Sequence, residues 1–182
     1  IVFIDLKRAF ETIDRNLLLS KLKNYHCHDN VVSWFSSYLS SRYQITKFNE
    51  EFSTKTPVNL GIPQGSVLSC LLFIVFINDI KNVFQYCNVR IFADDTLIEI
   101  VCDDPNDGLN KLNSDLANLR KYLCASKLSL NVSKTKFMLI SSRNHDLDSK
   151  VLIDDAEIDR VSEFKYLGVV LDDRLNMQAH TE

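Results

Sequence analysis

The sequence predicts an α+β fold in which helices pack on one face of an antiparallel sheet. Short apolar runs rich in β-branched residues occur at residues 1–4, 89–92 and 97–101. The last two flank a turn, which is typical of a β-hairpin. Leucines recur every three or four residues from Leu109 to Leu123, which predicts a helix with one apolar side. Strand and helix, then a hairpin, then helix and strand is the order of a split βαβ fold.

The first half of the chain is expected to be mainly helical. Asp14 is placed to cap a helix that runs to Tyr25. A second helix fits residues 29–39, where Val32, Phe35 and Leu39 form one stripe. Residues 42–48 and 51–58 are expected to form a hairpin, and residues 61–65 an irregular loop. Residues 66–83 are apolar on nearly every side, which predicts a helix buried in the core.

The second half is expected to contain one long helix and several strands. Asp104 and Pro105 open the helix, with the cap residue first and the proline in the first turn. A coiled coil is the alternative for this helix, but its leucine repeat stops at Leu123. The remaining expectations are a strand at 136–141, a tight hairpin of 151–153 with 157–161, and a final strand pair within 164–171.

Composition limits the classes of protein to which the chain can belong. The 182 residues suit one domain, or one domain and a fragment of another. A net charge of −3, from 24 acids against 21 bases, is mild evidence against a polynucleotide ligand. The five cysteines have no zinc-site spacing and are expected to be reduced thiols. No targeting signal or membrane-length apolar run occurs, so we expect an intracellular protein of the nucleus or cytoplasm that is not secreted. The chain opens in mid-strand without Met, and we expect a fragment truncated at both ends.

Three aspartates stand at the ends of apolar runs. Asp94 and Asp95 form an adjacent pair at the tip of the expected hairpin, and Asp5 ends the opening strand. Carboxylates at the ends of neighbouring strands can hold two Mg²⁺ ions, which is the apparatus of phosphoryl transfer. Asp is also common in turns because its side chain bonds nearby backbone. The pair alone therefore does not distinguish a metal site from an ordinary turn.

Three motifs in order give the chain a family resemblance. They are Asp5-Leu6-Lys7-Arg8-Ala9-Phe10, Gly61-Ile62-Pro63-Gln64-Gly65-Ser66 and Phe92-Ala93-Asp94-Asp95. Together they resemble the palm of a reverse transcriptase, an RNA-directed DNA polymerase, of the type encoded by jockey-like non-LTR retrotransposons. Residues 128–140 and 164–171 resemble that family's two following palm motifs. The resemblance implies a polymerase palm with partial fingers: palm at 1–25 and 61–141, a fingers-like insertion at 26–60, and primer-grip-like hairpins at 151–171.

The resemblance also implies roles for the acidic and basic site residues. Asp5 and Asp94 would be the main ligands of two Mg²⁺ ions, with Mn²⁺ as a possible substitute, and Asp95 a secondary ligand or structural partner. Lys134 would protonate the leaving pyrophosphate, although Lys136 is an alternative at two residues' distance. Structural alternatives are a strand-end cap for Asp5 and a solvated surface lysine for Lys134.

Further residues would contact the nucleotide and the primer. Phe10 would lie under the incoming sugar and reject a 2′-hydroxyl, although a Phe there can also simply join helix to sheet. Gln64 and Gly65 would contact the incoming nucleotide or its template partner. Tyr166-Leu167-Gly168 resembles the primer-grip hairpin.

The implied partners are an RNA template, a DNA primer and deoxynucleoside triphosphates. No membrane is implied, and the sequence does not indicate the oligomeric state.

Two alternatives to a working reverse transcriptase remain. One is a catalytically idle relic that at most binds nucleic acid or protein, in which Cys70 stands where the family usually has proline. The other is an RNA-templated RNA polymerase, against which Phe10 and Ala93 argue. The isolated chain, without complete fingers and thumb, is expected to bind Mg²⁺ weakly and polymerise poorly.

Overall fold

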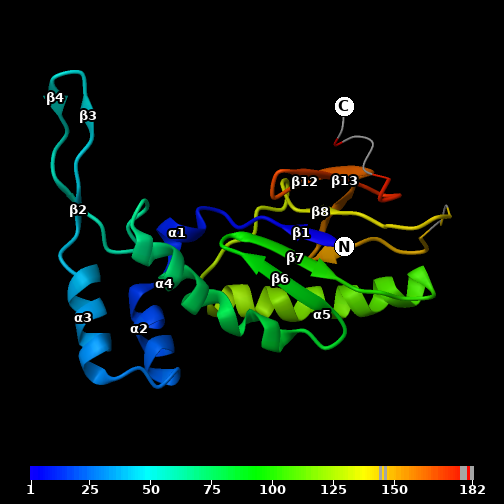
Figure 1. Cartoon of the computed structure of the whole chain (residues 1–182), viewed down its shortest axis with the longest axis horizontal. Helices are drawn as coiled ribbons and strands as arrows, with labels where there is room; N and C mark the ends of the chain where they lie inside the picture. The colour runs from blue at the N-terminus through cyan, green and yellow to red at the C-terminus, as the bar shows by residue number, and fades with distance from the viewer. Residues whose placement is uncertain (144, 146, 177–179, 181–182) are drawn as a thin grey trace. The chain divides into compact units, whose positions relative to one another are not determined.

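In the computed structural model, which describes residues 1–143, 145, 147–176 and 180, the chain forms two compact units. The first unit comprises Ile1–Lys7 with Asp79–Glu182, and the second comprises Arg8–Asn78. The elements of both are labelled in Figure 1. Among the described residues, no helix is both long and apolar enough to span a bilayer.

The first unit is built on a five-stranded sheet in the order β11-β8-β1-β7-β6. The strands are β1 Val2–Ile4, β6 Asn88–Phe92, β7 Asp95–Glu99, β8 Lys136–Phe137 and β11 Asp159–Arg160. Adjacent strands are antiparallel except β11 and β8, which run parallel. The expectation of a fully antiparallel sheet was therefore wrong. The expected strand 157–161 is interrupted at the buried Ile158, so that Glu157 pairs locally while Asp159 and Arg160 join the main sheet.

Alternation along β1 directs its side chains to two faces of the sheet. Phe3 contributes to a buried cluster with Leu97 and Met138, and its ring stacks on that of Phe164 with centroids 4.1 Å apart. Phe164 belongs to the hairpin of β12 Glu163–Tyr166 and β13 Val169–Asp172, which covers this face and confirms the expected strand pair. Val2 and Ile98 point the other way and are fully buried.

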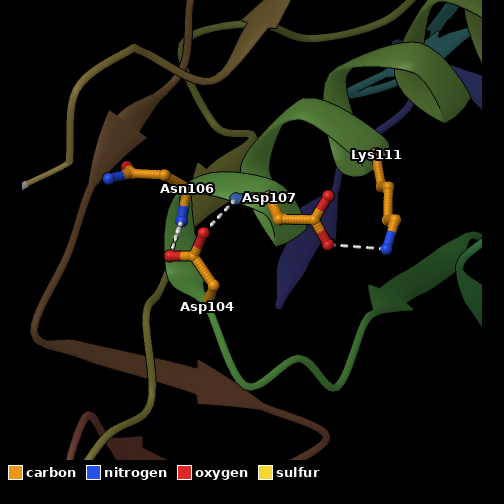
Figure 2. A network of polar contacts seen from close by, with 4 residues as sticks. All are labelled: Asp104, Asn106, Asp107 and Lys111. Atoms are coloured by element: carbon orange, nitrogen blue, oxygen red, sulfur yellow. Dashed lines mark hydrogen bonds and ion pairs between the residues drawn. The ribbon is translucent and has the colours of Figure 1, made fainter.

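The long helix α5, Pro105–Ala125, belongs to the first unit (Figure 1). All five leucines of its predicted apolar stripe are buried, at most 3% exposed. Asp104 caps the helix by accepting from the Asn106 amide at 3.1 Å and the Asp107 amide at 3.3 Å. One turn on, Lys111 donates to Asp107 at 2.6 Å (Figure 2). The cap and the proline start predicted from the sequence are thus confirmed.

A short hairpin of β9 Leu152–Ile153 and β10 Ala156–Glu157 turns at Asp154 and Asp155, as expected. Its Asp154 forms an ion pair with Arg120 of α5. The expected strand 136–141 is shorter than predicted, because only Lys136 and Phe137 pair with β1.

Helices dominate the second unit. They are α1 Ala9–Thr12, α2 Arg15–Asn24, α3 Asp29–Leu39 and α4 Val67–Ile77, which continues along the chain as the 3₁₀ helix η1 Asn78–Val83. The Asp14 carboxylate accepts from the amides of Asn16 and Leu17, so the predicted cap of α2 is confirmed. The helix α4 is less buried than expected, since Val67, Leu71 and Ile74 are 91%, 52% and 48% exposed.

The second unit also carries a long two-stranded ribbon, residues 42–58, as predicted. Its stem pairs β2 Tyr43–Gln44 with β5 Thr56–Pro57, and its outer part pairs β3 Lys47–Phe48 with β4 Glu51–Phe52. Two residues on the first strand, 45 and 46, stand opposite three on the second, 53–55. This extra residue is a β-bulge, which bends and twists the ribbon.

Candidate active site

The two adjacent aspartates lie where β6 turns into β7. Phe92 pairs with Asp95 across the hairpin, so Ala93 and Asp94 form a two-residue turn. Ala93 has φ +52°, a left-handed conformation that tight hairpin turns require. Asp94 is therefore at the tip, and Asp95 is the first residue of β7; both are exposed.

Asp5 reaches the same edge of the sheet from β1. Ile4 pairs with Thr96 in antiparallel register, so the next position along, residue 5, faces residue 95. The backbone after β1 is held by two contacts: the Asp5 amide donates to Thr135 Oγ1 at 3.2 Å, and the Asn131 amide donates to the Asp5 carbonyl at 2.8 Å. By alternation, the side chains of Asp5 and Asp95 lie on the face that carries Phe3.

A cavity of about 350 Å³ opens on that face, which we call the carboxylate cavity. Four of the residues predicted to form the site share it: Asp5, Asp95, Lys134 and Tyr166. Asp94 adjoins the cavity through Asp95 without lining it, and Leu167 and Gly168 form the turn of the β12–β13 hairpin beyond it. The remaining lining residues are Phe3, Ile4, Thr96, Ser133, Lys136 and Phe164.

The cavity has a concentration of negative charge. The pKa of Asp95 is raised first by partial burial, then by the charges of Asp94 and Asp5. The pKa of Tyr166 is also raised, by burial and by the Asp95 charge, against an opposing effect of Arg90. Burial is the largest cause of both shifts, and nearby negative charge adds to it because like charges disfavour one another's ionised forms. A cation placed among these carboxylates would relieve that repulsion.

The two candidate lysines differ in their partners. Lys136 donates to the Asp159 carboxylate at 2.6 Å, so its ammonium is held in an ion pair. Lys134 is exposed and makes no ion pair with any residue that the structure describes. Of the two, Lys134 is the one whose ammonium is available to a ligand in the carboxylate cavity.

The carboxylates present fit a divalent metal ion that takes its remaining ligands from water and a bound substrate. Among the described residues, no group of three or more His, Cys, Asp or Glu side chains is arranged to hold a metal alone. Mg²⁺ typically takes one or two carboxylates and completes its shell with water and substrate phosphates. Asp5 and Asp95 in one cavity, with Asp94 beside them, provide oxygen ligands of that kind.

Phe10, Gln64 and Gly65 all belong to the second unit. The Phe10 ring stacks on Phe73 of α4 with centroids 4.6 Å apart, which fixes its orientation. The loop that carries Gln64 is tied to the same segment, because the Ile62 amide donates to the Phe10 carbonyl at 2.9 Å. Gly65 has φ +81°, a conformation that side chains disfavour.

Arg15 braces this loop and was not singled out from the sequence. Its guanidinium donates to four backbone carbonyls: Gly61 at 2.7 Å, Leu39 at 2.7 Å, Val58 at 2.7 Å and Leu60 at 3.0 Å. Gly61 itself has φ +76°, and a Cβ there would lie 2.5 Å from the Glu11 carbonyl oxygen. The loop before Gln64 therefore has both a close backbone contact and a charged clamp. No local pattern signals a clamp whose acceptors are carbonyls 24 to 46 residues away.

The family model described as reverse transcriptase (RNA-dependent DNA polymerase) matches residues 1–171. The chain belongs to the reverse transcriptase family. The predicted resemblance to reverse transcriptases of jockey-like mobile elements is confirmed.

Several curated proteins of the fruit fly Drosophila melanogaster are similar to this chain. The chain is 27% identical to the probable RNA-directed DNA polymerase from transposon BS and 28% identical to the RNA-directed DNA polymerase from mobile element jockey, both of Drosophila melanogaster. It is 25% identical to the probable RNA-directed DNA polymerase from transposon X-element of the same species. Each match covers 98% of this chain and 20% of the relative. The chain thus spans about a fifth of the length of the curated relatives it matches.

Asp115 is a second residue that the sequence analysis missed. It is fully buried within α5, and its carboxylate accepts from the amides of Gln85 at 2.9 Å, Tyr86 at 2.8 Å and Cys87 at 2.8 Å. These contacts anchor the segment that leads into β6 and so into the aspartate hairpin. A signal was available, since Asp115 stands three residues after Leu112, on the buried side of the leucine stripe.

Proposed function

We propose that the first unit carries the catalytic centre of an RNA-directed DNA polymerase that extends a DNA primer on an RNA template with deoxynucleoside triphosphates. The observation that carries the proposal is the shared cavity of Asp5, Asp95 and Lys134, with Asp94 at the adjoining turn. Nucleotidyl transfer needs carboxylates that can bind metal ions and an ammonium that can donate a proton. Membership of the reverse transcriptase family supports the choice of reaction.

Asp5 and Asp94 would hold two Mg²⁺ ions, or Mn²⁺ in their place, and Asp95 would assist them. The ions held by these carboxylates would supply positive charge that lowers the pKa of a primer 3′-hydroxyl and neutralises the triphosphate. Lys134 would supply the proton that the leaving pyrophosphate requires, since Lys136 is engaged by Asp159. Tyr166, Leu167 and Gly168 would steer the primer end, with the hairpin fixed on the sheet by the stacked rings of Phe3 and Phe164.

The second unit would contribute nucleotide selection. The stacked Phe10 ring would lie under the sugar and exclude a 2′-hydroxyl, while Gln64 and Gly65 would contact the nascent base pair. The assignment of palm to 1–25 and 61–141, of a fingers-like insertion to 26–60 and of primer-grip-like hairpins to 151–171 is part of the same proposal. We place the protein's work inside the cell, in the nucleus or cytoplasm.

Paramagnetic Mn²⁺ tests the metal site on the chain itself. Added with dTTP, Mn²⁺ should broaden the amide NMR signals of residues 4–6 and 93–96, and Asp5→Asn or Asp94→Asn should suppress the broadening. A matched control exists at the β9–β10 turn, which also presents two adjacent aspartates, but with Asp154 neutralised by Arg120. Asp155→Asn should leave the broadening at residues 93–96 unchanged. Equal effects of Asp94→Asn and Asp155→Asn would refute the assigned site.

A further inference from the structure

The strand pairing between β1 and β8 breaks off beside the carboxylate cavity. At its other end the Met138 amide donates to the Ile1 carbonyl at 2.9 Å. Hydrogen-bonded pairs recur at every second residue of an antiparallel ladder, so continued pairing would join the Asp5 amide to the Lys134 carbonyl. The Asp5 amide instead donates to Thr135 Oγ1 at 3.2 Å. A side-chain oxygen thus takes the place of a backbone carbonyl where the ladder ends.

This exchange of acceptors releases the backbone of Lys134 from the sheet. The Lys134 amide turns back and donates to the Asn131 carbonyl at 3.2 Å, while the Asn131 amide donates to the Asp5 carbonyl at 2.8 Å. The turn of residues 131–135, which we call the lysine turn, is therefore attached to Asp5 at both ends, through the Asn131 amide and the Thr135 hydroxyl. Lys134, which this turn carries, lines the carboxylate cavity, as does Asp5.

Thr96 offers a comparison within the same sheet. Thr96 pairs with Ile4 on the other side of β1, and it is as buried as Thr135, at 1% against 0% exposed. Within the described part of the chain, the Thr96 hydroxyl has no hydrogen-bond partner. Burial in a strand or turn beside β1 therefore does not by itself bring a threonine hydroxyl onto the backbone of that strand. The contact with Asp5 is particular to Thr135 and to the turn that carries Lys134.

We propose that Thr135 is a positioning residue of the nucleotidyl-transfer site, whose hydroxyl holds the lysine turn against Asp5 so that the Lys134 ammonium reaches the carboxylate cavity. The inference rests on the proposed function, from which Lys134 and the carboxylates take their roles. Thr135 acts through the Asp5 amide, in the way that supporting hydrogen bonds orient the groups of a site. Without the hydroxyl, the turn keeps one of its two attachments to Asp5 and should shift together with Lys134.

The distance of Lys134 from the carboxylates can be compared between variants without metal or activity. A water-soluble carbodiimide converts a carboxylate into an O-acylisourea, and a neighbouring amine displaces the urea to form an amide bond. Peptide mass spectrometry then quantifies Lys134 joined to Asp5 or Asp95. The pair of Lys150 and Glu157, which is 2.5 Å apart and does not line the cavity, serves as the internal standard.

Three variants separate the hydroxyl from its surroundings. Thr135→Val keeps the shape of the side chain and should lower Lys134 coupling at least about fivefold relative to the standard, because small displacements strongly slow a reaction between positioned groups. Thr135→Ser keeps the oxygen and should retain coupling within about twofold of the wild type. Thr96→Val is the same change at an equally buried site, and it should also stay within about twofold.

Metal binding gives a second readout and keeps this inference apart from the proposed function. With Mn²⁺ and dTTP, the amide signals of residues 133 and 134 should broaden together with those of residues 93–96. Thr135→Val should reduce the broadening at 133 and 134 relative to that at 93–96, because the effect of the ion falls steeply with distance. Absent broadening in the wild type would refute the proposed metal site, whereas the coupling experiment contains no metal and would still decide the role of Thr135.

Several results would overturn the inference. They are absent Lys134 coupling in the wild type, unchanged coupling in Thr135→Val, and a loss in Thr96→Val as large as that in Thr135→Val. Circular dichroism verifies the fold of each variant. Should Thr135→Val fail to fold, hydrogen exchange of the wild-type Asp5 amide decides instead, since Thr135 Oγ1 is its acceptor. Protection of at least about 100-fold would support the role of the hydroxyl, and exchange at the rate of an exposed amide would exclude it.

Discussion

The clamp formed by Arg15 allows a quantitative test of how the second unit is held together. Arg15→Met keeps most of the aliphatic stem and removes all donors to Gly61, Leu39, Val58 and Leu60. A hydrogen bond from a charged donor contributes about 1.5–3 kcal/mol when its loss leaves an unsatisfied buried partner. Arg15 is only partly buried, so water replaces some of these contacts. We therefore expect a loss of about 2–4 kcal/mol rather than the sum of four bonds.

Trp34 is the chain's single tryptophan and lies in α3, the helix whose last carbonyl Arg15 binds. Urea unfolding followed by its fluorescence therefore reports the second unit. Lys23→Met, an exposed substitution on the same helix as Arg15, should stay within about 0.5 kcal/mol of the wild type. Arg15→Lys should recover less than half of the loss, because one ammonium cannot span four carbonyls. A shift for Arg15→Met no larger than that for Lys23→Met would refute the clamp.

Three further predictions concern other parts of the chain. Asp115→Ala should destabilise the first unit by about 3–5 kcal/mol in urea unfolding monitored by circular dichroism, because three amides lose their acceptor; a loss below about 1 kcal/mol would contradict that role. Burial, followed by the nearby Asp115, raises the pKa of the Cys87 thiol to about 12. Iodoacetamide at about pH 8 should therefore alkylate the exposed Cys70, Cys102 and Cys124 well before Cys87, as peptide mass spectrometry would show, and early labelling of Cys87 would count against its burial. In an active polymerase containing this chain, Phe10→Ala should raise incorporation of ribonucleotides relative to deoxynucleotides at least about tenfold in primer extension, and an unchanged ratio would exclude Phe10 as the selecting residue.

Elements governed by local periodicity were predictable from sequence. The helix at 29–39 was predicted with both of its ends, and the caps at Asp14 and Asp104 were identified because an N-cap and the amides that donate to it are neighbours in sequence. The hairpin that carries Asp94 and Asp95 was also predicted, although its second strand begins two residues earlier than expected. In each case the determining contacts span only a few residues.

The errors arise where distant segments decide the structure. Whether 157–161 is one strand depends on the competition between β9 and β8 for its backbone, which the local pattern does not encode. The exposed side of α4 could not be predicted from a segment that is apolar on every side. The roles of Asp5, Asp94 and Asp95 were proposed from a resemblance, and the cavity that Asp5 and Asp95 share follows from the β1–β7 register, a pairing across more than 90 residues. Arg15 and Asp115 bind backbone far away in sequence, so only the folded chain reveals their partners, although the leucine stripe already places Asp115 on the buried side of its helix.

The segment of Gln85, Tyr86 and Cys87 belongs to no strand or helix, yet each of its amides is hydrogen-bonded to one carboxylate of α5. Their protons can exchange with deuterium only when that helix separates from the segment. Gln85 and Tyr86 have exposed side chains, but their amides should exchange as slowly as those of the sheet interior. A stretch that resembles an ordinary surface loop thus serves as a natural reporter for the opening of the first unit.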